Sequence, residues 1–120
     1  MEKKAIKRQY LEVKSRAGVY AIRNHATGRA LIAGAPNVEG VLNRHRFELR
    51  FGQHRNKSLM KDWQTFGESG FSFEVLDRIK PSDDPAFNAV EELAQLVNLW
   101  RVEMGCQGAL DYAENLKEAP

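Results

Sequence analysis

Two short apolar segments near the start of the chain contain its most informative side chains. The first is Gly18-Val19-Tyr20, and the second, eleven residues later, is Ile32-Ala33-Gly34. A tyrosine hydroxyl held in a fixed place can orient a water molecule or take a proton from it, which phosphoryl-transfer chemistry could use. The alternative for Tyr20 is a half-buried strand tyrosine whose hydroxyl reaches a backbone partner. Ile32 can neither donate nor accept a hydrogen bond, so the two segments together offer one hydroxyl.

Histidines are the second group of candidates. His54 lies in the polar loop Gly52-Gln53-His54-Arg55-Asn56, where an imidazole beside an arginine and an asparagine suits contact with a phosphate. The alternative for His54 is a hydrogen bond that only pins the loop. His45 falls on the apolar stripe of the preceding helix, so we expect it to face the core or an interface rather than to bind a ligand.

Six basic side chains follow one another along the middle of the chain and could form one surface that tracks a phosphate backbone. The alternative is a solvated helix face, on which Arg44 pairs with Glu48 one turn later. The six residues of this predicted nucleic-acid-binding surface are Arg44, Arg46, Arg50, Arg55, Lys57 and Lys61.

Composition sets the broad class of the protein. The chain has 120 residues, of which 42% are hydrophobic and 28% charged, as expected of one globular domain. Its net charge of +2 hides an asymmetry: residues 1–16 and 17–80 each carry +4, and residues 81–120 carry −6. This asymmetry favours an anionic partner for the first two thirds of the chain.

The same composition bears on location. No apolar run approaches the ~20 residues of a membrane-spanning helix, and the basic N-terminus has no apolar segment behind it that would make a secretory signal. The single cysteine, Cys106, excludes an internal disulfide. We therefore expect a cytoplasmic protein without membrane contact.

The strands that must position these side chains follow from the hydrophobic pattern. A β-hairpin is predicted from Gly18–Asn24 and Ala30–Ala33, with Gly28 in its turn. A third strand is predicted over Phe71–Leu76, where aromatic and polar residues alternate. Five aromatic residues of this strand and of the predicted helices are expected in the core: Trp63, Phe66, Phe71, Phe73 and Trp100.

Three helices are predicted after the hairpin, each from signals at its ends. An asparagine or aspartate precedes the first and third helices, and a glycine ends the first and second. The third helix carries acidic residues in its first turns, where the helix dipole favours them. The predicted spans are Asn37 to Gly52, Ser58 to Gly67, and Asp84 to Met104, the last with Pro85 at its first position and its apolar stripe from Phe87.

These elements predict an α+β (α/β) fold, in which a small three-stranded antiparallel sheet is sandwiched by helices around one core. Residues 1–16 are predicted to form a basic helix or arm. The main domain is predicted over residues 17–104. Residues 105–120 are predicted to be a C-terminal extension that packs on the same domain, with Tyr112 tucked back against it.

In this order and spacing the segments resemble the GIY-YIG family, known from intron homing endonucleases and from a DNA-repair nuclease. The two glycine segments match the motifs that name the family. The following helix and loop, Leu49 to Asn56, fit its pattern of helix, glycine, histidine and asparagine. The resemblance covers residues 17–100 and also includes Leu59, Asp62, Trp63, Phe66, Gly67 and the strand Phe71–Leu76. It implies a GIY-YIG-like fold.

The resemblance also implies which positions carry the family's chemistry. Tyr20 keeps the first tyrosine, which acts on the nucleophilic water. Ile32 stands at the second tyrosine, and Val41 or Leu42 stands where a helix arginine stabilises charge on the phosphate. Val97 stands where a glutamate binds the metal ion, so no metal ligand is expected. These apolar replacements are expected to converge on one site.

Three functions follow from the resemblance. The adopted interpretation is a nuclease-like domain that has lost its catalytic centre and serves as a nucleic-acid-binding or interaction module, with DNA or RNA as partner and no cofactor. The second is a divergent endonuclease that hydrolyses phosphodiesters with Mg²⁺ or Mn²⁺. The third is a protein–protein adaptor, whose acidic last third docks a basic partner or a second copy. The endonuclease would use Tyr20, His54, Arg44 or Arg46, and one displaced carboxylate among Glu91, Glu92 and Glu103.

Overall fold

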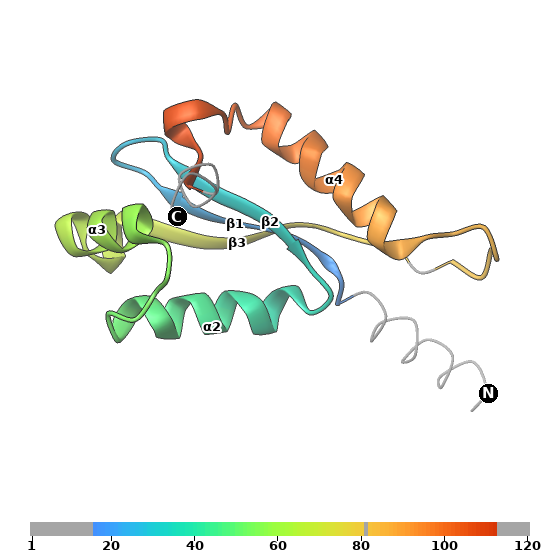
Figure 1. Ribbon diagram of the computed structural model, residues 1–120, viewed down its shortest axis with the longest axis horizontal. Coiled ribbons are helices and arrows are strands. Elements are labelled where there is room, and N and C mark those ends of the chain that lie inside the picture. The colour runs from blue at the N-terminus through green and yellow to red at the C-terminus, as the bar shows by residue number, and fades with distance from the viewer. Residues whose placement is uncertain (1–15, 81, 113–120) are drawn as a thin grey trace.

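The computed structural model describes residues 16–80 and 82–112. The predicted arm over residues 1–16 lies outside these ranges apart from Arg16, and so does the predicted extension beyond Tyr112. The described chain contains a three-stranded antiparallel sheet with strand order β2-β1-β3 and helices on both of its faces (Figure 1). The predicted α+β architecture is confirmed.

The sheet is built around the predicted hairpin. Strand β1 (Gly18–Asn24) pairs with β2 (Ala30–Ala35), and Gly28 supplies the turn with a φ of 79°. The third strand, β3 (Phe71–Arg78), pairs with the other edge of β1. A register shift between Val19 and Tyr20 interrupts this second pairing.

Helices α2 (Val38–Arg50), α3 (Lys57–Phe66) and α4 (Ala89–Glu103) each begin behind an asparagine whose side chain accepts a backbone N–H of the first turn. Two single turns of 3₁₀ helix, η1 (Glu68–Gly70) and η2 (Gly108–Leu110), complete the described elements. None of the described helices is long and apolar enough to cross a membrane.

The predicted start of the long helix is wrong. Helix α4 begins at Ala89, and its N-cap is Asn88, which accepts the N–H of Glu91 at 3.1 Å. The Asp84 side chain instead accepts the N–H of Ala86 at 2.9 Å. An aspartate that bonds to the backbone two residues ahead makes an Asx turn, so this side chain is engaged in a turn before the helix begins.

The sheet separates two apolar clusters, because successive side chains of a strand point to opposite faces. On one face, Tyr20 and Ile22 pack with α2 and α3. On the other, Val19 and Ile32 pack with α4. Figure 1 shows α2 and α4 on these opposite sides. The predicted core is correct for Trp63 and Phe71, which are buried, and wrong for Phe66, which is 39% exposed at the end of α3.

Two glycines of the hairpin permit close approach of neighbouring backbone and helix. A Cβ atom at Gly34 would lie 2.8 Å from Leu93 Cγ and 2.9 Å from Val97 Cγ2 of α4. A Cβ atom at Gly18 would lie 2.3 Å from the carbonyl oxygen of Asp77. The lack of a side chain therefore sets how near α4 lies to β2 and how near β3 lies to β1.

Tyr112 closes the end of the sheet where the hairpin turn lies. Its side chain is fully buried. Its hydroxyl donates to Asp62 Oδ2 at 2.6 Å and accepts from Asn24 Nδ2 at 3.2 Å. Its carbonyl oxygen accepts from Asn56 Nδ2 at 3.0 Å, and the Arg29 guanidinium lies 4.2 Å from its ring centroid. Tyr112, which follows η2, thus joins β1, α3 and the loop before α3.

Tyr112→Phe should lower the free energy of unfolding by about 1–3 kcal/mol, since it removes the buried hydroxyl that bonds to Asp62 and Asn24. Tyr112→Ala should lower it by about 3–5 kcal/mol, because it also leaves a cavity. Urea unfolding followed by circular dichroism measures both. Leu110→Ala, at a side chain 42% exposed, is the control and should change stability by less than about 0.5 kcal/mol. Equal midpoints for wild type and Tyr112→Phe would contradict the assigned hydrogen bonds.

Candidate functional site

A cavity of about 500 Å³ opens on the α2 face of the sheet. Its floor is strand β1 and β2, and its walls are α2 and the loop that joins α2 to α3. Seven of its nine lining residues have polar side chains, and the other two are Leu31 and Ala33. The polar lining consists of Tyr20, Arg44, His45, Glu48, His54, Arg55 and Asn56.

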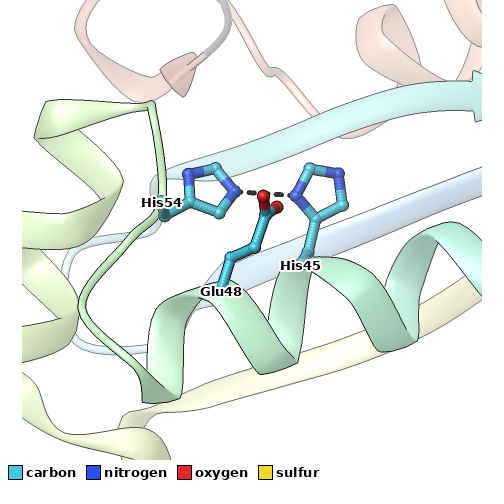
Figure 2. A group of neighbouring side chains, drawn as sticks. All are labelled: His45, Glu48 and His54. Carbon is cyan, nitrogen blue, oxygen red and sulfur yellow. Dashed lines mark hydrogen bonds between the residues drawn. The ribbon is translucent and has the colours of Figure 1, made fainter.

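A chain of hydrogen bonds runs from the backbone of this loop to the sheet. The N–H of Asn56 donates to His54 Nδ1 at 3.1 Å. The next two links join His54 Nε2 to His45 Nδ1 at 2.7 Å and His45 Nε2 to the Tyr20 hydroxyl at 2.9 Å. Figure 2 shows the two imidazoles pointing toward each other, with His45 and Glu48 on the helix and His54 on the loop. Among the residues that the structure describes, the Tyr20 hydroxyl therefore bonds to an imidazole and not to a backbone group.

The backbone fixes the direction of this chain. An amide N–H can only donate, so His54 Nδ1 is the acceptor and a neutral His54 carries its proton on Nε2. His54 then donates to His45 Nδ1, and a neutral His45 donates through Nε2 to Tyr20. The Tyr20 oxygen accepts this bond and keeps its own proton. Within residues 16–80 and 82–112 that proton has no acceptor, so it is available to a ligand in the cavity.

Burial keeps the three hydrogen-bonded side chains neutral. Burial, followed by the charges of His54 and Arg44, lowers the pKa of His45 from 6.5 to about 4. Burial also lowers the pKa of His54 and raises the pKa of Tyr20, with Arg44 opposing the shift of the tyrosine. Neutral imidazoles and a protonated phenol are the forms that the direction of the hydrogen bonds requires.

The six predicted basic residues fall into separate groups. Arg44 and Arg55 line the cavity. Arg46 lies over the Phe73 ring at 4.6 Å. Arg50 forms two hydrogen bonds with the Glu68 carboxylate, at 2.8 and 2.6 Å. Lys57 and Lys61 belong to α3. Two of the six residues, Arg44 and Arg55, therefore line the same cavity as Tyr20.

The expected convergence of the apolar replacements is wrong. Ile32 is buried in the cluster beneath α4, where Val97 packs against it. Val41 and Leu42 belong to the cluster of Tyr20 on the opposite face. The cross-strand partner of Tyr20 is Ala33, and that of Ile32 is Ala21. Because paired residues share a face, the side chain of Ile32 points away from the tyrosine.

Carboxylates near Tyr20 come from α2 and not from α4. Glu91 and Glu92 lie at the start of α4, on the far side of the sheet, in a depression shared with Asp84 and Asn88. Glu103 ends the same helix. Glu48, one turn after Arg44, lines the cavity itself.

His45, Glu48 and His54 are close enough to be considered as metal ligands, because one ligand atom of each lies within 4.8 Å of the others. A histidine binds a metal through an unprotonated nitrogen. His54 Nε2 carries the proton as long as Asn56 N–H occupies Nδ1, so His54 does not fit this role in the observed conformation. His45 Nδ1 is occupied in the same way, because it accepts the hydrogen bond from His54 Nε2. The Glu48 carboxylate is the donor of the three that remains.

The sequence pattern singled out Tyr20, His54 and Arg44 as candidates. It placed His45 in the core or at an interface and named Glu48 only in the alternative ion pair with Arg44. The structure brings both into the cavity beside Tyr20. Their separation of three residues was the available signal, since residues at i and i+3 share a helix face. Helix α2 has an apolar stripe with a histidine and a glutamate along one side of it. This pattern is typical of a helix that contacts both the core and a polar cavity.

The comparisons with known proteins concern the fold. The sequence matches no family model and no curated protein. The structure matches the catalytic domain of homing endonuclease I-TevI with a TM-score of 0.58 and 21% identity, over 74% of this chain and 88% of that one. A point mutant of that intron endonuclease domain matches with a TM-score of 0.57 and 21% identity, over 74% and 84%. The resemblance to the GIY-YIG family is thereby confirmed at the level of the fold.

Acidification should destabilise the fold through His45. Between pH 6.5 and about 4 the unfolded chain binds a proton at this histidine and the folded chain does not, so the free energy of unfolding falls as the pH falls through this window. Tyr20, His54, Arg44 and Glu48 surround the imidazole. His45→Gln removes the titrating group and should flatten the pH dependence. Urea unfolding across the window tests this, and parallel curves for the two proteins would contradict it.

Proposed function

We propose that the domain binds nucleic acid and that a backbone phosphate occupies the cavity. The observation that carries this proposal is the meeting of Arg44, Arg55 and the unused Tyr20 proton in one opening. Guanidinium groups and a hydroxyl donor are the groups that contact phosphate oxygens. Two guanidinium groups against the single carboxylate of Glu48 leave the lining positively charged.

The nuclease-like fold supports the same proposal. I-TevI is described as a homing endonuclease and an intron endonuclease, so the fold is used by at least one protein that acts on nucleic acid. Positive charge in the first two thirds of the sequence agrees with an anionic partner.

Arg44→Ala combined with Arg55→Ala should weaken binding to a labelled oligonucleotide and reduce the salt slope of log Kd by about 2, because each lost phosphate contact removes about one unit. Fluorescence anisotropy at several salt concentrations measures both quantities. Arg23→Ala is the control for each single substitution, Arg44→Ala or Arg55→Ala: it removes one positive charge from the α4 face, where Arg23 pairs with Glu74. Binding that does not respond to salt would refute a phosphate site.

Cleavage is the second candidate function, favoured by the hydrogen-bonded chain that ends on Tyr20. A chain of two neutral imidazoles can pass a proton to or from a hydroxyl. Mg²⁺ needs only one or two carboxylates besides substrate phosphates, and Glu48 would be the protein ligand in this cavity. The ion would supply charge stabilisation at the phosphate.

If the domain cleaves, supercoiled plasmid incubated with Mg²⁺ or Mn²⁺ should give nicked circles, and EDTA should prevent them. Tyr20→Phe should abolish nicking, because it removes the hydroxyl and leaves the ring in the core. The Arg23→Ala variant should nick as wild type does. Intact plasmid under all metal conditions, together with oligonucleotide binding, would leave the binding module as the function.

A further inference from the structure

Two phenylalanine rings stand on the water-facing side of α2 and its C-cap. Phe47 is 59% exposed and Phe51 is 63% exposed. Their ring centroids lie 4.4 Å apart with an interplanar angle of 33°. The two rings contact each other and belong to neither buried cluster. Such a pair keeps a large apolar surface in water, which marks a place of contact with another molecule.

Helix spacing places the pair next to two residues that line the cavity. Phe47 follows Arg44 by three residues, and Phe51 follows Glu48 by three, while both Arg44 and Glu48 line the cavity. Side chains at i and i+3 are neighbours on a helix surface, with about 5–6 Å between their Cβ atoms. The aromatic row therefore runs beside the row that faces the cavity.

Resting on the proposed function, we propose that Phe47 and Phe51 stack against an unpaired base of single-stranded nucleic acid whose phosphate occupies the cavity. Aromatic rings bind bases of any sequence, since every base has a π-face, and the neighbouring guanidinium groups hold the backbone. One nucleotide could thus place its phosphate in the cavity and its base on the aromatic pair beside it.

This arrangement selects for single strands. In a duplex the faces of the bases are covered by their neighbours in the stack, so a ring on the protein surface reaches them only by unstacking a step. A purely apolar protein partner is the competing occupant. The positive cavity beside the rings favours the nucleic acid, because an apolar partner would leave Arg44 and Arg55 unused.

The test compares labelled single-stranded DNA, single-stranded RNA and a duplex of the same sequence by fluorescence anisotropy at fixed salt. Wild type should bind the single strands more tightly than the duplex. Phe47→Ala combined with Phe51→Ala should weaken single-strand binding about tenfold or more and leave duplex binding and the salt slope unchanged. Phe51→Tyr, which keeps a ring, should retain the preference for single strands.

Leu99→Ala combined with Val102→Ala is the control, since these side chains are 61% and 63% exposed on α4, on the other side of the sheet. It should bind as wild type does. Equal affinity for single strands and duplex, or unchanged binding by the double phenylalanine variant, overturns the inference while the effect of Arg44→Ala with Arg55→Ala still supports the phosphate site. A wild-type dimer that the phenylalanine substitutions dissociate, seen by size-exclusion chromatography, overturns it too. Absence of all binding overturns both proposals.

Discussion

The hydrogen bond from the Asn56 N–H to His54 Nδ1 determines the chemistry of the site. A backbone amide cannot exchange the roles of donor and acceptor, and so each imidazole beyond it has only one neutral tautomer that satisfies its neighbours. As a result, the Tyr20 oxygen accepts a hydrogen bond from His45 Nε2 and directs its own proton into the cavity. A hydroxyl in this state is a donor to anionic oxygen, and it acts as a base only if the chain reverses.

The same asparagine ties the site to the rest of the fold. Its side chain accepts the N–H of Leu59 at the start of α3 and donates to the carbonyl oxygen of Tyr112. Tyr112 in turn bonds to Asn24 of β1 and Asp62 of α3. The position of the Asn56 N–H therefore depends on Tyr112, nine positions after the end of α4. The direction of the hydrogen bonds that lead to Tyr20 depends on the same residue. A substitution at Tyr112 would therefore alter the cavity by moving the loop that holds Asn56, since Tyr112 does not line the cavity itself.

Local signals in the sequence were sufficient for most of the fold. The hairpin with its Gly28 turn, the N-cap at Asn37 and the order of elements depend on residues within a few positions of one another. The start of α4 was misplaced because Asp84 and Asn88 are both suitable caps, and sequence alone does not say which side chain is already engaged in a turn. The sheet face on which each side chain lies also could not be predicted from nearby residues. Whether Ile32 shares a face with Tyr20 depends on the pairing register of β1 with β2, in which Ala33 and not Ile32 lies opposite the tyrosine.

The division of the sheet into two faces changes what the apolar replacements mean. Ile32 and Val97 pack together under α4, next to Gly34, where a Cβ atom would collide with Leu93 and Val97. Their size and apolar character are explained by the close approach of that helix to β2. The polar cavity lies on the other face and keeps two imidazoles, two guanidinium groups, a carboxylate and a tyrosine. Ile32 and Val97 are therefore explained by packing beneath α4. Val41 and Leu42 belong to the apolar cluster of Tyr20 on the α2 face, which also holds the polar side chains of the cavity.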